Sequence, residues 1–178
     1  MEVKIEKAKV GDGEMLADVF YRTWLATYPN EKYGITVDDI EDRFAKRRAE
    51  MAKVKEEDKD EKLKNPPPGS TTLVAWVENK IVGVCRIVVN DERNQLKAIY
   101  VLPEYQGKGI GKMFWQECEK YFNLEKDTYV EVAVYNDNAR AFYEKIGFVD
   151  TGRRMTDEGT RMKSGVMIPE MEMLLKAK

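Results

Sequence analysis

VLPEYQGKGIG, residues 101–111, carries three glycines at alternate positions and runs straight into an apolar segment. The three are Gly107, Gly109 and Gly111. Glycine costs about 0.5–1 kcal/mol relative to alanine inside a helix or strand, so we expect this loop to use the freedom of its glycines. Glycines between a strand and a helix let the backbone approach a ligand closely, and the unpaired N–H groups of a first helical turn bind anions. With Lys108 and Lys112 beside them, these residues are typical of a loop that binds a diphosphate.

Two familiar phosphate-binding motifs do not fit the stretch. The dinucleotide fingerprint requires G-x-G-x-x-G, whereas the spacing here is G-x-G-x-G. The P-loop requires four residues between its glycines and then Lys-Ser or Lys-Thr, but Gly107 and Gly111 enclose three residues and Lys112 precedes Met113. On these residues alone, a nucleotide-binding module and a glycine-rich turn without a ligand remain alternatives.

The composition limits the class of protein. The chain has 178 residues, a net charge of −2 and a pI of about 5.5, which fits one domain and does not favour a nucleic-acid partner. Histidine is absent, which excludes a histidine base and a histidine-ligated metal. Two cysteines, Cys85 and Cys118, are too few for a zinc site or a disulfide framework. We therefore expect no metal, and we expect both cysteines to pack in the core instead of carrying an acetyl group.

The chain shows no signal for a membrane. No apolar run approaches membrane-spanning length, and the first ten residues alternate like a strand without the apolar core of a signal peptide. We therefore expect no membrane partner and a cytoplasmic location with reduced thiols.

Apolar periodicity predicts a single mixed α/β domain over residues 1–178. Strands are expected near residues 3–5 and at 71–77, 81–89, 95–102, 128–135, 148–153 and 166–175. Helices are expected after an N-cap at Asp12, over the segment marked by Ile40 and Val54, and at 111–122 and 138–146. Ten of the twelve residues from 53 to 64 are charged, which predicts a charged helical extension around residues 45–65. The pattern favours a largely antiparallel sheet with one strand–helix–strand unit at its centre.

Two blocks of the sequence resemble the GCN5-related N-acetyltransferases (GNAT superfamily). The first is the glycine loop, where Gln106, Gly109 and Gly111 fill the family pattern Q/R-x-x-G-x-G/A. The second is VYNDNARAFYEKIGF, residues 134–148, where an asparagine precedes a helical tyrosine by seven residues and Gly-Phe closes the helix. The motif spacing is most similar to the ribosomal-protein N-terminal and polyamine-type acetyltransferases.

The resemblance implies a GNAT fold, in which a mixed, mostly antiparallel sheet flanked by helices is splayed between its fourth and fifth strands. Acetyl-CoA, a co-substrate, is then expected in the gap. The backbone of Ile99, Tyr100 and Val101 is expected to pair with the pantetheine amides as a strand would, and the Val101 N–H to polarise the thioester carbonyl. Asn136 is expected to bond the pantetheine or to order the helix start. The diphosphate is expected on Gln106, Gly107, Lys108, Gly109, Ile110, Gly111 and Lys112.

Acetyl transfer to an amine requires removal of a proton from the amine and help for the departing thiolate. The resemblance implies that Tyr143 is the acid that assists the thiolate, although its place on the apolar face of a helix also suits core packing. It implies that Glu131, twelve residues earlier, is the base, as in the subfamily that acetylates the N-termini of ribosomal proteins. The alternative for Glu131 is an exposed strand residue. Tyr28 and Tyr33 are expected to line the acceptor site.

The expected function is acetyl-CoA-dependent N-acetylation of a primary amine by direct transfer in a ternary complex. The acceptor is a small amine or polyamine, or a protein N-terminus or lysine, and the protein is expected to be a monomer or homodimer. A CoA-binding sensor without turnover and a nucleotide-binding module are the alternatives.

Overall fold

The computed structural model describes residues 1–55, 58 and 60–177. Its strands are β1 (Lys4–Lys7), β2 (Ser70–Val77), β3 (Lys80–Val89), β4 (Asn94–Val101), β5 (Thr128–Ala133), β6 (Val149–Thr156) and β7 (Pro169–Leu175). Its α-helices are α1 (Gly13–Thr27), α2 (Val37–Met51), α3 (Glu61–Lys64), α4 (Ile110–Cys118) and α5 (Asp137–Lys145). Short 3₁₀ helices are η1 (Glu31–Tyr33), η3 (Pro103–Tyr105) and η4 (Glu158–Thr160). Within these described residues, no helix is both long and apolar enough to cross a membrane.

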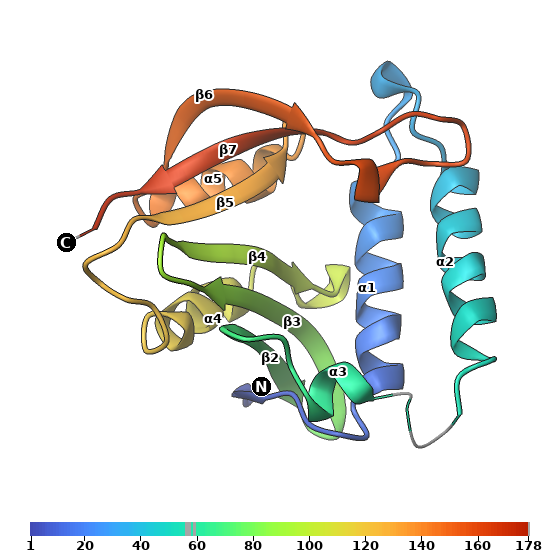
Figure 1. Ribbon diagram of the computed structural model, residues 1–178, viewed down its shortest axis with the longest axis horizontal. Coiled ribbons are helices and arrows are strands. Elements are labelled where there is room, and N and C mark those ends of the chain that lie inside the picture. Colours follow the sequence, from blue (N-terminus) through green and yellow to red (C-terminus); the bar gives the residue numbers. More distant parts are fainter. Residues whose placement is uncertain (56–57, 59, 178) are drawn as a thin grey trace.

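The strands form one sheet in the order β1-β2-β3-β4-β5-β7-β6. β4 and β5 run parallel, and the other neighbouring strands are antiparallel. β4 and β5 pair through three residue pairs, of which the last joins Leu96 to Val130. Beyond that pair the two strands diverge (Figure 1). The predicted fold is therefore confirmed: the sheet is mixed, mostly antiparallel and splayed between its fourth and fifth strands.

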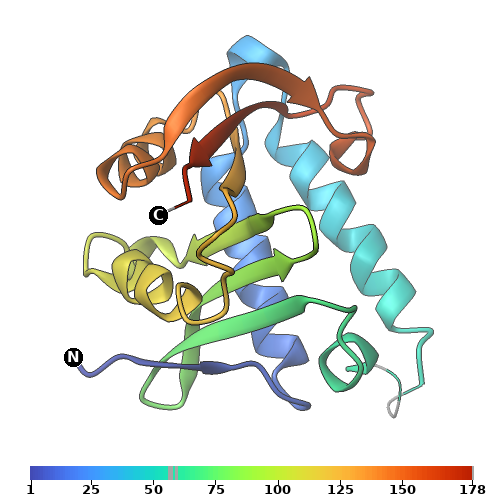
Figure 2. The same cartoon turned by 60° about the vertical axis from the view of Figure 1, so that its left-hand side comes forward.

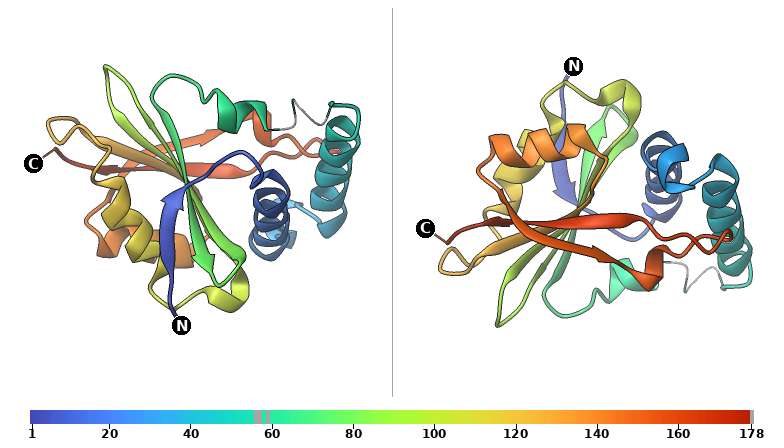
Figure 3. Two further views of the ribbon diagram at one scale, coloured as in Figure 1. Left: turned by 90° about the horizontal axis from the view of Figure 1, so that it is seen from below. Right: turned by 90° about the horizontal axis from the view of Figure 1, so that it is seen from above.

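Helices cover both faces of the sheet. α4 and α5 lie on one face, and α1 lies on the other with α2 outside it (Figure 3). The side chains of β5 alternate between the two layers, because successive residues of a strand point to opposite faces. Val130 and Val132 join the main core with Phe114 of α4. Ala133 joins a second cluster with Ile40 of α2.

The charged segment after α2 is less helical than predicted. α2 ends at Met51, before Val54, and α3 holds four residues. Of the predicted extension over 45–65, residues 56, 57 and 59 lie outside the described residues. Asp60 accepts a hydrogen bond from the N–H of Gly11 at 2.5 Å. This contact ties the segment between α2 and β2 to the loop before α1 (Figure 2).

The predicted N-cap of α1 is confirmed in position: Asp12 directly precedes the helix, although its carboxylate accepts the N–H of Lys9 at 2.8 Å and makes no cap bond to the helix. The predicted ends of two other elements shift because a local hydrogen bond competes with the regular pattern. α4 ends at Cys118 and continues as tight turns, in which the Tyr121 N–H donates to the Cys118 carbonyl. β5 ends at Ala133, whose carbonyl accepts the N–H of Asn136.

Candidate active site

A β-bulge in β4 decides which face its second half presents. Arg86 of β3 pairs with Ala98, and Ile87 pairs with Leu96, so Lys97 is the extra residue on β4. A bulge interrupts the alternation of side chains along a strand. Tyr100 therefore lies on the face opposite Leu96, where it packs against Phe20 of α1 at 5.5 Å between ring centroids.

The edge of β4 that faces the splay carries backbone groups that β5 does not pair. The Leu102 N–H donates to the Val82 carbonyl on the β3 side at 2.9 Å. Because the backbone groups of successive strand residues point in opposite directions, those of Tyr100 also point toward β3, and those of Ile99 and Val101 point toward the splay. The Gln106 side-chain amide donates to the Val101 carbonyl at 2.9 Å.

The three glycines of the loop have two different structural roles. Gly107 and Gly109 have φ angles of +72° and +83°, and a Cβ added to either would meet no atom within 4 Å. They are glycines because the backbone is left-handed there, and the space beside them is open. Gly111 lies inside α4, where an added Cβ would lie 3.2 Å from the Phe142 ring. It is a glycine because α4 and α5 pack closely.

The loop leads into the first turn of α4, which begins after Gly109, and the N–H groups of a first helical turn have no partner within the helix itself. Lys108 and Lys112 are exposed beside these groups, and the Lys108 ammonium lies 5.0 Å from the centre of the Tyr105 ring. The Ile110 side chain is buried in the main core, so its backbone alone is available to a ligand. Together, the N-terminus of the helix, the glycines and the lysines suit the binding of a diphosphate.

Asn136 and Tyr143 lie at the two ends of the buried side of α5. The Asn136 side-chain oxygen accepts the N–H of Ala139 at 3.1 Å, so this residue caps the helix. Tyr143 is 5% exposed and packs against Phe142 and Phe148. Within the described residues its hydroxyl has no hydrogen-bond partner. Burial, with the nearby Cys85, raises the pKa of Tyr143 well above its ordinary value.

On the opposite face of the sheet, four tyrosines connect the end of α1 to β4 and β5. The hydroxyls of Tyr28 and Tyr100 lie 2.8 Å apart. The Tyr135 hydroxyl donates to the Tyr28 carbonyl at 2.9 Å, and the Tyr33 ring stacks on Tyr135 at 5.1 Å between centroids. Burial is the main cause that raises the pKa of Tyr135 to about 12. The structure thus brings together Tyr28 and Tyr33, the two residues predicted for the acceptor site.

Three glutamates lie on this same tyrosine-bearing face of β5 and β7. Glu131 is paired with Glu172, and Ala133 is paired with Glu170. Directly paired residues of antiparallel strands share a face, as do residues two apart on one strand. Glu131, Glu170 and Glu172 are therefore neighbours, and Glu131 and Glu170 are half-buried.

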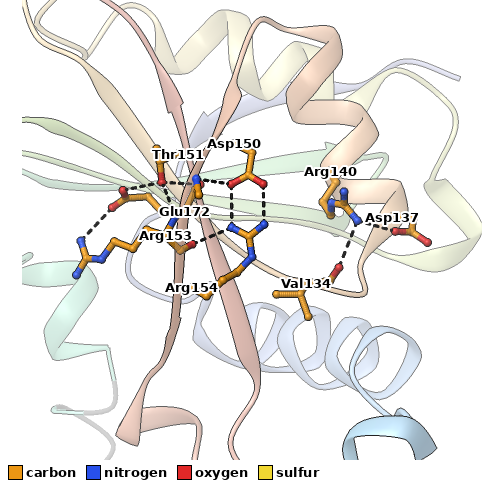
Figure 4. Close-up of polar contacts among 9 residues, drawn as sticks. Val134, Asp137, Arg140, Asp150, Thr151, Arg153, Arg154 and Glu172 are labelled. Carbon is orange, nitrogen blue, oxygen red and sulfur yellow. Dashed lines mark hydrogen bonds and ion pairs between the residues drawn. The ribbon is translucent and has the colours of Figure 1, made fainter.

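Glu172 is held by cations and is not open to a ligand. Its side chain is 7% exposed and lies 3.3 Å from Arg153 and 3.8 Å from Arg93. Thr151 donates to the same carboxylate at 3.2 Å. Figure 4 shows Arg153 and Thr151 reaching Glu172, while the neighbouring Arg154 pairs with Asp150. Glu131 and Glu170 form no such pair within the described residues.

The connection between β6 and β7 forms a rim over this face. Arg43 of α2 donates to the Gly159 carbonyl at 2.6 Å, and the Asp39 carboxylate accepts the Ser164 N–H at 3.0 Å. Burial opposes the ionisation of Asp39, but hydrogen bonds from Thr36 and Ser164 outweigh it and lower the pKa to about 2. The rim is thus fixed to α2 by charge-assisted hydrogen bonds.

A separate depression of about 490 Å³ is lined by polar residues that include Arg93, Asp127 and Tyr129. These residues lie where β4 and β5 begin, whereas the glycine loop follows the end of β4. The depression is therefore not part of the candidate site.

A family model described as the acetyltransferase (GNAT) family matches residues 21–148 of the sequence. This chain belongs to the GNAT family. As a GNAT protein it is an N-acetyltransferase, and its sheet has the splay that the family resemblance implied. The GNAT chain is 27% identical over 158 residues to a spermidine N(1)-acetyltransferase of Thermoplasma acidophilum, with 83% of this chain and 89% of that protein covered.

Solved structures share the fold of this GNAT chain. The PaiA N-acetyltransferase of Thermoplasma acidophilum, solved with coenzyme A, has a TM-score of 0.64 at 22% identity and covers 97% of this chain and 98% of its own. The ribosomal-protein-S18-alanine N-acetyltransferase of Escherichia coli has a TM-score of 0.65 at 15% identity, and the match covers 99% of this chain and 95% of that chain.

Sequence reasoning missed two features of this GNAT site. The bulge at Lys97 has no signal within β4 itself, because a bulge is defined by the pairing with β3. Glu170 had a local signal: Glu170 and Glu172 alternate with methionines, which places both carboxylates on one face of a strand. That pattern did not reveal that Glu131 lies on the next strand of the same face.

Proposed function

We propose that this protein transfers the acetyl group of acetyl-CoA to a primary amine of a cationic, polyamine-like acceptor. The observation that carries this proposal is the pair of half-buried carboxylates, Glu131 and Glu170, on the face with the tyrosines. Neither carboxylate has a cation partner within the described residues, so an ammonium group would complete the site. The likeness to a spermidine N(1)-acetyltransferase supports the same acceptor class.

Acetyl-CoA is proposed to lie in the splay between β4 and β5. Its diphosphate would bind the N–H groups of residues 107–112, with Lys108 and Lys112 beside them. Its pantetheine amides would pair with the backbone of Ile99 and Val101 on the edge of β4 that faces the splay. The tyrosine-bearing face of the sheet is the proposed acceptor face. Tyr100 would contribute its side chain to this face, because its backbone points toward β3. Gln106 would have to release the Val101 carbonyl, to which it donates in this structure.

The transfer is proposed to be direct, in a ternary complex. The amine, once it has lost a proton to a carboxylate of the acceptor face, attacks the thioester carbonyl. Glu131 is the carboxylate that the family resemblance predicts. The Val101 N–H polarises the carbonyl, and the Tyr143 hydroxyl assists the departing thiolate. The high pKa of Tyr143 favours a hydrogen bond to sulfur over full proton transfer.

Release of CoA thiol with a panel of amines tests this function. We expect kcat/KM for spermidine and spermine to exceed that for lysine and for peptides with a free N-terminal alanine by about tenfold or more. Binding of CoA without thiol release for any amine would instead indicate a CoA-binding sensor. Thermal stabilisation by ATP and not by CoA would indicate a nucleotide-binding module.

A further inference from the structure

We propose that Glu170 of β7, and not Glu131 of β5, takes the proton from the acceptor amine. This inference rests on the proposed N-acetyltransferase function and assigns one of its steps to a residue that the sequence motifs do not mark.

The position of Glu170 leaves its carboxylate open to the acceptor. Glu170 is paired with Ala133 on β5, and side chains of directly paired residues start about 4.5–5.5 Å apart. Because Ala133 ends at its Cβ, it does not cover the longer glutamate. Glu131 is the diagonal neighbour, at about 7–8 Å along such a ladder. A substrate ammonium can therefore lie over Ala133 with Glu170 on one side and Glu131 on the other.

Glu170 also lacks the partners that hold its neighbour in the strand. Glu172, two residues on, is bound by Arg153, Arg93 and Thr151. The described residues offer Glu170 neither a hydrogen bond to its side chain nor an ion pair. A half-buried carboxylate without a partner is costly unless a ligand or a proton completes it.

Charged and titratable groups from several elements face Glu170. They are Glu131 from β5, Asp157 from the rim, Lys97 from the β4 bulge, and the hydroxyls of Tyr28, Tyr100 and Tyr135. Burial raises the pKa of Glu170, and the charges of Glu131 and Asp157 raise it further, to about 7, against a smaller opposing effect of Lys97. A general base is most effective when its pKa lies near the working pH. Glu170 meets this condition because its surroundings disfavour its charge.

The Glu170 carboxylate accepts one proton from the acceptor ammonium, and the freed nitrogen lone pair forms the C–N bond at the thioester carbonyl. The C–S bond then breaks as the carbonyl re-forms, and the electron pair leaves with the CoA sulfur. The attacking nitrogen gives up its second proton, which reaches that sulfur through Tyr143 or solvent and yields the amide and the CoA thiol. Glu170 returns its proton to solvent. Glu131 takes no proton in this step: it holds the ammonium in place, and its charge raises the pKa of Glu170.

The pH profile of kcat/KM for spermidine separates the two glutamates. Wild-type protein should lose activity as the pH falls through about 7, because Glu170 becomes protonated. Glu170→Gln should lower kcat/KM by about 10²–10⁴-fold at pH 7 and abolish this ionisation, leaving only the dependence on free amine. Glu170→Asp should keep this ionisation in the pH profile but lower kcat/KM. Glu131→Gln should keep the ionisation and move it to lower pH, because a like charge beside Glu170 is removed.

Glu14→Gln, an exposed change in the first turn of α1, is the matched control and should leave the profile unchanged. Equal affinity for CoA, measured by calorimetry, checks that each variant is folded. If Glu131→Gln abolishes the ionisation, or if Glu170→Gln keeps the wild-type profile, the inference is wrong while the proposed function stands. If the wild-type protein acetylates no amine, the proposed function is wrong and the inference with it.

Discussion

The hydroxyl oxygens of Tyr28 and Tyr100 lie 2.8 Å apart, which joins the end of α1 to the part of β4 that follows the bulge. Burial is the first cause that raises the pKa of both groups, so the contact is a hydrogen bond between neutral hydroxyls. It sets the position of the Tyr100 side chain on the proposed acceptor face.

Tyr28→Phe should therefore affect the acceptor more than the cofactor. Loss of this hydrogen bond should lower the free energy of unfolding by about 0.5–1.5 kcal/mol. We expect KM for spermidine to rise about two- to tenfold while KM for acetyl-CoA is unchanged. Tyr121→Phe, on the α4 side of the sheet, serves as the control. An unchanged KM for spermidine would remove Tyr28 from the acceptor site.

Gly109→Val should abolish tight binding of acetyl-CoA in a protein that still folds. The φ of +83° and the empty surroundings mean that valine strains the loop and fills the proposed diphosphate site without touching the core. Gly152→Val is a matched control, because Gly152 has a φ of +82° and equally empty surroundings on β6. The two variants should lose similar stability, and calorimetry should show at least about a tenfold loss of CoA affinity for Gly109→Val alone. Equal affinities in both would contradict the diphosphate assignment.

Tyr143→Phe should keep CoA binding and lower kcat by about 10–10³-fold, because one hydrogen bond to the departing sulfur is lost. The ring remains to pack against Phe148. Since the hydroxyl has no partner within the described residues, the melting temperature should change little. A clear loss of stability with normal kcat per folded molecule would show that Tyr143 serves the core instead.

Asp39→Asn should loosen the rim that crosses the acceptor face. The folded pKa of about 2 lies below the value of about 3.9 expected in the unfolded chain. The charge of Asp39 therefore stabilises the fold above about pH 4, and this contribution is lost as the pH falls through about 2. Urea unfolding should show a deficit of about 1 kcal/mol for the variant at pH 7 that narrows toward pH 2. A deficit that is constant across this range would show that the charge contributes nothing.

Much of the fold could be predicted from local patterns in this sequence. Strand alternation and helical periodicity placed the main strands and helices, and the splay followed from the family resemblance of the glycine loop and the Asn136–Phe148 block. A local conformation was predictable where only one residue type adopts it easily. Gly107 and Gly109 are the example, because their backbone is left-handed. Helix C-termini were less predictable: the helix predicted over residues 111–122 ends at Cys118, where tight turns replace it.

The sequence by itself determined the glycine loop proposed to bind the diphosphate, the strand–helix–strand unit and the position of the tyrosine on α5, because each depends on residues close together in the chain. Only the tertiary structure decided the acceptor face. Lys97 forms a bulge because the pairing of β4 with β3 skips it, and that bulge places the Tyr100 side chain on the same face as Tyr28. Glu170 lies beside Glu131 because β7 returns between β5 and β6, thirty-nine residues later in the chain. The charge and burial around a carboxylate are set by neighbours in space, so its chemistry is decided only when the strands are paired.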